Sequence, residues 1–350
     1  MFDDGTEKDT DKFYNYDYCT SSDFVPNALN CASVFRMRDL FEETLLHCRE
    51  QGELLSSVRD DDSLFLWALD CLAHSPTALG LIRKAMDNGW SIQLSDLGTG
   101  GFHLDIPEKE LTLDHYGLTA DSLAKSAFFR DEFLFSFVRG LRDIWQEIRF
   151  GAMERDYRPE ALLMLERVRA ADADTLCVLV AWELRSAGFP DIWRHILGSD
   201  IGDLAATYAD TIEQHGSSFI TKVPLKRVFR QWFFNEARVD RVDHETLNAM
   251  DMVLEWAEDQ DEFGKPFGER HLDHKVITLI SCLPDGKPYL RGIAKEICNG
   301  LEFVNIHDAI NEAHLFQIVY DMDVVMVDHV PFRDGTLARK IFPDADVERL

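Results

Sequence analysis

The segment Thr175–Trp182, TLCVLVAW, constrains the fold of this chain more than any other stretch. It is the second half of a helical pattern that Pro159 begins and Gly188 ends, since proline suits the first turn of a helix and glycine its end. A helix through TLCVLVAW presents apolar side chains in every direction. Such a helix is stable only when other elements cover all of its surface. The sequence therefore predicts a mainly helical protein built around a buried central helix.

Composition and charge limit the possible partners. The 350 residues are 46% hydrophobic, which suits two domains, or one large domain with an appendage. The formal net charge is −27, so phosphate backbones and anionic membranes would be repelled. We expect a protein or peptide as partner, no nucleic acid and no membrane. Seven scattered cysteines without a CxxC pair, and an N-terminus without a signal-peptide pattern, predict a cytoplasmic protein.

Changes of composition along the chain predict three parts. Residues 1–30 are rich in Asp, Ser, Thr and Tyr without any period, which is typical of a disordered acidic tail. Residues 31–263 carry helical apolar patterns and form the expected core domain. Pro and Gly recur after residue 264, and we expect residues 264–350 to form a C-terminal appendage.

Residues 90–114 change to an alternating pattern. In WSIQLSDL, Trp90, Ile92 and Leu94 fall on one side, and the GTGG that follows marks a turn before further alternation. A turn is favoured over a nucleotide-binding loop because neither Lys-Ser/Thr nor a helix follows the glycines. Two or three short antiparallel strands fit this pattern. The predicted fold class is α+β, predominantly helical, with a small antiparallel sheet packed on a helical core.

A long helix is expected over residues 121–149, directly after the sheet. One face of this helix is apolar, and a second stripe is polar at helical spacing, with Arg139, Arg142, Asp143 and Gln146. Zinc peptidases of the zincin class carry His-Glu-x-x-His on a helix after the sheet, where the two His bind the metal and the Glu polarises its water. The segment RDIWQ, which begins at Arg142, has this spacing but none of the three residue types. A degenerate metal helix, a solvated polar face and an Arg–Asp network all remain open.

The helix that begins at Pro159 carries carboxylates beside its apolar half. An isolated buried charge is too costly, so these carboxylates are either paired with arginines or functional. A salt-bridge network with Arg139, Arg142 or Arg185 is one interpretation. A functional site is the other interpretation.

Several stretches, among them FVRGLRDIWQE and ERVRAADADTLCVLVAWELRSAGFPDIWRH, resemble a bacterial protein family of unknown function that carries the description "putative metallopeptidase". The resemblance covers about residues 85–250. It implies a zincin-like fold, a metal-dependent hydrolase, and residues 121–149 as the metal helix. An active enzyme of this kind would use zinc, with Asp143 or Glu147 as general base; the expected metal ligands are Glu166, Asp172 and Glu183. The further residues expected to line the site are Arg139, Arg142, Gln146 and Arg169. Members of that family often carry His where this chain has Gln146, so this chain departs further from a competent zinc site. The alternative is a non-catalytic helical binding or scaffolding protein.

Overall fold

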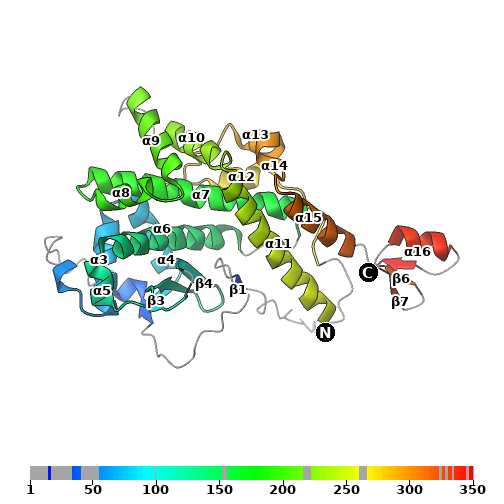
Figure 1. The fold of residues 1–350 in the computed structure, drawn as a ribbon, viewed down its shortest axis with the longest axis horizontal. Coiled ribbons are helices and arrows are strands. Elements are labelled where there is room, and N and C mark those ends of the chain that lie inside the picture. The colour runs from blue at the N-terminus through cyan, green and yellow to red at the C-terminus, as the bar shows by residue number, and fades with distance from the viewer. Residues whose placement is uncertain are drawn as a thin grey trace, which may run out of the picture. The chain divides into compact units, whose positions relative to one another are not determined.

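The computed structural model describes residues 15–16, 34–40, 55–98, 100–151, 156–215, 222–259, 266–322, 325–327, 330–332, 335–343 and 347–349. Most of these residues are helical, and short strands form the rest of the regular structure (Figure 1). The predicted α+β, predominantly helical class is therefore confirmed. None of the helices in these ranges is both long and apolar enough to cross a membrane. The predicted tail, residues 1–30, lies outside the described residues except for Asn15–Tyr16.

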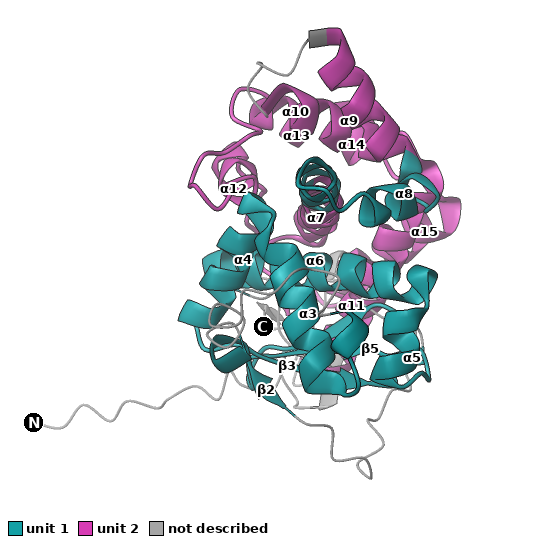
Figure 2. Ribbon diagram, turned by 90° about the vertical axis from the view of Figure 1, so that its left-hand side faces the viewer, with its two compact units in different colours: residues 1–152, 176–202 teal, residues 153–175, 203–350 magenta. Residues whose placement is uncertain are grey.

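The chain forms two compact units, which Figure 2 colours separately. Unit 1 comprises residues 1–152 and 176–202, and unit 2 comprises residues 153–175 and 203–350. One helix, α7 (Pro159–Ser186), contributes to both units. All but one of its residues from 161 to 181 are buried, which confirms the predicted buried helix. The predicted boundaries of the core domain and the C-terminal appendage stay predictions.

In its described residues, unit 1 combines the C-terminal part of α7 with a sheet and further helices. The helices whose two ends lie among the described residues are α3 (Asp61–Ala73), α4 (Pro76–Asp87), α5 (Ala120–Lys125), α6 (Ala127–Phe150) and α8 (Asp191–Leu197). The strands are β1 (Asn15–Tyr16), β2 (Phe35–Arg36), β3 (Ser91–Ser95), β4 (Phe102–Asp105) and β5 (Glu110–Asp114). Ile92 and Leu94 alternate inward along β3, as the sequence predicts.

The sheet is mixed, so the predicted antiparallel sheet is wrong in this respect. The strand order is β1-β4-β5-β3-β2, and β5 pairs parallel to β3 while the other pairs are antiparallel. The physical reason is that β5 turns back from β4 in a short hairpin and inserts between β4 and β3. The buried carboxylate of Asp114 at the end of β5 ties the segment between β3 and β4 to the turn after β5, because it accepts hydrogen bonds from the backbone N–H groups of Leu97, Gly100 and Tyr116. Alternation along each strand does not reveal such an insertion.

Helix α6 approaches this sheet closely at Gly140. A Cβ atom added to Gly140 would lie 2.6 Å from Cδ1 of Leu111 on β5 and 3.3 Å from Cδ2 of Phe102 on β4. Both side chains are buried. The missing side chain therefore allows the close packing of α6 on the sheet. This packing fixes the rotation of α6 about its axis, and so the direction in which its polar stripe faces.

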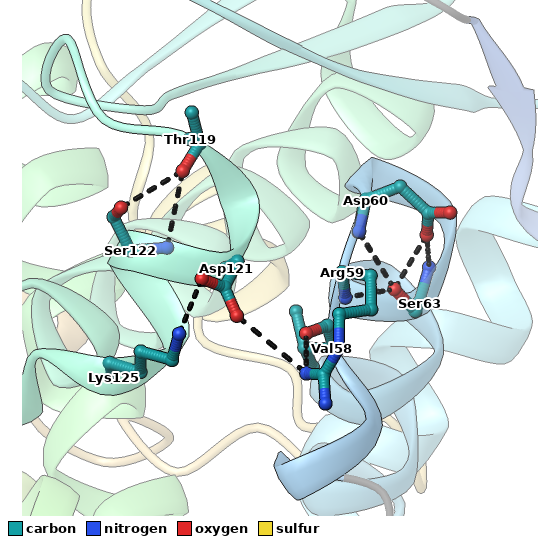
Figure 3. Close-up of polar contacts among 8 residues, drawn as sticks. All are labelled: Val58, Arg59, Asp60, Ser63, Thr119, Asp121, Ser122 and Lys125. Carbon is teal, nitrogen blue, oxygen red and sulfur yellow. Dashed lines mark hydrogen bonds and ion pairs between the residues drawn. The ribbon is translucent and has the colours of Figure 1, made fainter.

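The starts of α3 and α5 are fixed by local caps and joined by an ion pair (Figure 3). Asp60 caps α3 by accepting from the Ser63 N–H at 3.0 Å, and the Ser63 hydroxyl accepts from the Asp60 N–H in return. Thr119 caps α5 by accepting from the Ser122 N–H at 3.3 Å. Arg59 then contacts Asp121 in the first turn of α5 at 3.6 Å. This pair is largely exposed, so we expect it to contribute less than about 1 kcal/mol.

The described part of unit 2 is mainly helical, with a small sheet near its end. Its helices besides α7 are α9 (Gly202–His215), α10 (Lys222–Trp232), α11 (Glu236–Asp259), α12 (His274–Ile280), α13 (Ala294–Asn299), α14 (Leu301–Val304), α15 (Ala309–Asp321) and α16 (Gly335–Ile341). Its strands are β6 (Val325–Val327), β7 (Val330–Phe332) and β8 (Val347–Arg349), all antiparallel in the order β7-β6-β8.

Candidate functional site

The predicted site residues are divided between the two units. Those in unit 1 are Arg139, Arg142, Asp143, Gln146, Glu147 and Glu183, and those in unit 2 are Glu166, Arg169 and Asp172. Of the three proposed metal ligands, two therefore lie in one unit and the third in the other. All three come from α7, because one long helix supplies residues to both units.

The polar stripe of α6 is largely buried. Arg142 and Gln146 are 0% exposed, while Asp143 and Glu147 are partly exposed. A solvated polar face is therefore excluded for Arg142 and Gln146. Each of these four side chains also has an interaction partner. The position of the first His in a zincin helix thus holds a buried guanidinium, which has donors only and cannot bind a cation.

Arg142 also contacts an aromatic ring on its own helix. Its Cζ atom lies 5.7 Å from the centroid of the Trp145 ring, and Cζ of the exposed Arg149 lies 5.2 Å from it. These distances are within the range of cation–π attraction. Trp145 is 5% exposed, so the indole is part of the core of unit 1. Aromatic stacking accounts for part of the environment of Arg142 without any metal.

Glu183, a predicted metal ligand, caps another helix. Its carboxylate accepts hydrogen bonds from the Ser75 hydroxyl at 2.5 Å, the Thr77 N–H at 3.0 Å and the Thr77 hydroxyl at 2.9 Å. Ser75 is the N-cap of α4 and Thr77 is in its first turn. A carboxylate stabilises this end of a helix because it satisfies a free N–H group and complements the helix dipole. The geometry gives Glu183 a structural task in unit 1.

Asp172 and Glu166, the other predicted ligands, are engaged within unit 2. Asp172 is fully buried and accepts from the Tyr289 hydroxyl at 2.8 Å. Glu166 accepts from Arg169, one turn later on α7, at 3.3 Å. The structure therefore brings Glu166 and Arg169 together, whereas the salt-bridge interpretation named Arg139, Arg142 or Arg185 as the partners. Asp174, a neighbour that was not a candidate, accepts from the Trp232 indole N–H at 2.8 Å.

The structure contains a buried ion pair between Arg167 and Asp243 that the sequence does not predict. Arg167 is 1% exposed and Asp243 is 0% exposed, and two hydrogen bonds of 2.5 Å join them. Burial raises the pKa of the Asp243 carboxyl, and the hydrogen bonds from Arg167 oppose this effect. The two residues are 76 positions apart, so no local pattern pairs them. The only available signal was the position of Arg167 inside the mostly apolar face of α7.

The described residues do not fit the zinc ion that a metallopeptidase needs. Such a site requires three protein donors that converge on one point. No group of three or more His, Cys, Asp or Glu that could hold a metal occurs in the part of the chain that the structure describes. Glu183 and Asp172 already accept hydrogen bonds from neutral donors, and Arg142 replaces a ligand with a cation.

The comparison with known families agrees with the resemblance drawn from the sequence. Residues 127–290 match the family model described as "Putative metallopeptidase family (DUF6782)". This segment is similar to that family. It begins at the first residue of α6 and includes every predicted site residue, from Arg139 to Glu183. It leaves out β3, β4 and β5, so the match does not extend to the sheet that a zincin-like fold would require.

Two further comparisons give no match. No curated protein is similar to this chain, and no solved structure is similar to it. A proposed function therefore rests on two observations, the match to this family and the geometry of the described residues.

Proposed function

We propose that this chain is a metallopeptidase-like protein that no longer carries out metal-dependent hydrolysis and acts as a binding or scaffolding protein. In this proposal α6 is a degenerate metal helix of a zincin-like ancestor. The partner is a protein or peptide, and the chain works in the cytoplasm. The carrying observation is the complete burial of Arg142 at the first ligand position of the motif. A buried guanidinium repels a metal ion at that point.

The retained core supports the same proposal. The apolar face of α6, with Phe133, Phe137, Leu141 and Ile144, is fully buried. Folding requires this face, whereas hydrolysis requires ligands and a general base. A chain that keeps the apolar face of α6 but lacks the metal ligands fits a protein that is selected for its binding surface and its stability. The alternative is an active peptidase, with Asp143 or Glu147 as general base and with Glu166, Asp172 and Glu183 on the metal.

Metal content tests the proposal most directly. The full chain is purified without chelators, and zinc, manganese and iron are measured by elemental mass spectrometry. We expect far less than one ion per chain. We also expect no hydrolysis of a quenched fluorescent peptide library when each metal is added. One ion per chain that is lost in Glu183→Gln and kept in Glu160→Gln, a control on the same helix, contradicts the proposal.

Variants of α6 separate the two alternatives. Asp143→Ala and Glu147→Ala are expected to change stability or partner binding, because both side chains have interaction partners in the fold. Neither variant is expected to abolish a hydrolytic activity. A peptidase activity of the wild-type chain that disappears in either variant, while circular dichroism shows an unchanged fold, supports the active-enzyme alternative instead.

A further inference from the structure

Helix α10 is a basic helix in a strongly acidic chain. Its sequence, KVPLKRVFRQW, carries four cations and no carboxylate, whereas the whole chain has a net charge of −27. Cations concentrated on one short helix of an acidic protein form a local potential opposite to that of their surroundings.

The apolar side of α10 holds this helix in unit 2. Leu225, Val228, Phe229 and Trp232 are each 0% exposed. The Phe229 ring lies 6.4 Å from the Tyr289 ring, and the Trp232 indole donates to Asp174. Because one side of the helix is fixed in this way, its cations lie along the other side. Lys222, Lys226 and Arg230 follow one another at intervals of four, so they share one stripe.

A second basic segment lies beside this stripe. Arg230 forms an ion pair with Glu296 on α13. At the other end, the hydrogen bond from Lys287 lowers the pKa of the Asp285 carboxyl, and the positive charge of Lys222 lowers it further. The stripe therefore runs along residues 285–296. We call the cations of both segments the basic strip; its residues are Lys222, Lys226, Arg230, Lys287, Arg291 and Lys295.

Half of the basic strip has no internal counter-charge. Lys226, Arg291 and Lys295 form no ion pair with any carboxylate in the described ranges of the chain. An exposed aromatic residue follows α10, since Phe234 is 71% exposed. Val223 on α10 is also partly exposed. The surface therefore allows both charge pairing and apolar contact with a partner of opposite charge.

We infer that the basic strip is a docking surface for a short acidic segment of a protein partner. The segment is rich in Asp and Glu and carries an aromatic or aliphatic residue that reaches Phe234. Its carboxylates pair with Lys226, Arg291 and Lys295. This inference concerns a surface apart from the predicted metal helix, so it does not depend on whether peptidase chemistry is lost.

The size of the surface favours a short peptide over a polymer of phosphates. The eleven residues of α10 extend about 16 Å, a length that about five extended residues match. A nucleic acid or an anionic membrane carries its charge far beyond this distance. Its phosphates would then meet the acidic remainder of the chain and be repelled.

A defined peptide tests the inference on the full chain. The probe is a fluorescein-labelled decapeptide of eight glutamates and two phenylalanines, and binding is followed by fluorescence anisotropy at 50 and 300 mM salt. We expect saturable binding that weakens at the higher salt concentration. Lys226→Glu combined with Lys295→Glu is expected to weaken binding by about tenfold or more. Phe234→Ser is expected to weaken binding of this probe but not of a decaglutamate probe.

A matched control separates the strip from net charge. Arg339→Glu combined with Lys340→Glu reverses two exposed cations on α16 and changes the net charge by the same amount. We expect this variant to bind the probe as the wild-type chain does. Equal weakening in both double variants overturns the inference. So does the absence of saturable binding, or tighter binding of a single-stranded 20-mer oligonucleotide or of phosphatidylserine vesicles.

Discussion

Arg167 on α7 and Asp243 on α11 form a two-point ion pair with almost no access to solvent. Nε donates to one carboxylate oxygen and Nη2 to the other, each at 2.5 Å. Nη1 of Arg167 also donates to the carbonyl oxygens of Phe303 at 2.8 Å and Asn305 at 3.0 Å. One guanidinium thus joins three segments of unit 2. The buried charge is tolerated because its donors meet acceptors in this way.

Removing Arg167 is expected to destabilise the protein strongly. Arg167→Met leaves the Asp243 carboxylate and two carbonyls buried without their donors, and we expect a loss of about 3–5 kcal/mol in unfolding free energy. Urea denaturation followed by circular dichroism measures this loss. The control is Arg158→Met, because the pair of Arg158 with Glu160 is partly exposed and is expected to contribute less than about 1 kcal/mol. Similar losses in the two variants would contradict this view of the buried pair.

Glu183 is expected to act on stability through α4. Glu183→Ala removes the acceptor for three donors at the start of that helix, and we expect a loss of about 1–3 kcal/mol. Glu183→Gln keeps an acceptor oxygen but loses the charge, so its loss should be smaller. Thermal denaturation of both variants tests the order. A wild-type stability that falls on addition of a chelator, with no effect of the chelator on Glu183→Gln, would instead identify Glu183 as a metal ligand.

Local signals in the sequence predict some helix boundaries, but the single helix expected over residues 121–149 is two helices, α5 and α6, which meet at Ser126. Asp60 and Pro159 mark the starts of α3 and α7, because caps and first-turn prolines act over only a few residues. The alternation in β3 likewise identifies a strand and its buried side. The parallel pairing of β3 with β5 is not predictable in the same way, because it depends on which strand inserts between two others.

The candidate site depends on contacts that no local pattern contains. Helical spacing places Arg142 and Gln146 on one stripe of α6, but it does not say what covers that stripe, and both are fully buried. The partners of Glu183 lie more than a hundred positions earlier, at Ser75 and Thr77. The sequence therefore shows that the carboxylates of α7 need partners, whereas only the fold shows that hydroxyl and N–H groups provide them.

Gly140 is expected to be required for the packing of α6 on the sheet. Gly140→Ala gains up to about 1 kcal/mol of helix propensity. It also places a methyl group 2.6 Å from Cδ1 of Leu111, which is 0% exposed and cannot move freely. Overpacking of this kind costs about 1–3 kcal/mol, so we expect a net loss of stability.

A double-mutant cycle tests the reason for that loss. Leu111→Val shortens the side chain that the new methyl group meets, so Gly140→Ala should be less harmful in the Leu111→Val background than in the wild type. The measurement is the unfolding free energy of the four proteins in urea. Additive effects would show that Leu111 is not the obstacle.

Asp131 lies in the first part of α6, in a cluster of charged side chains within unit 1. Asp131 is 7% exposed, so it is buried in the fold. Burial raises the pKa of Asp131 from 3.8 to about 6; Arg130 and His195 oppose the rise, and Asp191 adds to it. The nearest cation is Arg130, whose Nε lies 3.7 Å from Oδ1 of Asp131. His195 is itself engaged with Glu132 at 2.7 Å. The folded state therefore favours the protonated carboxyl.

Stability is expected to fall as Asp131 ionises. Since its folded pKa is above the unfolded value, Asp131 stabilises the fold below about pH 4, and this contribution is lost as pH rises through about 6. Asp131→Asn cannot ionise, so its advantage over the wild type should grow from pH 5 to pH 8, to at most about 3 kcal/mol. Urea denaturation of both proteins across this range measures the difference. An advantage that stays constant with pH, or that shrinks as pH rises, would contradict the raised pKa of Asp131. Such a result is expected if Arg130, and not burial, has the larger effect on this carboxyl.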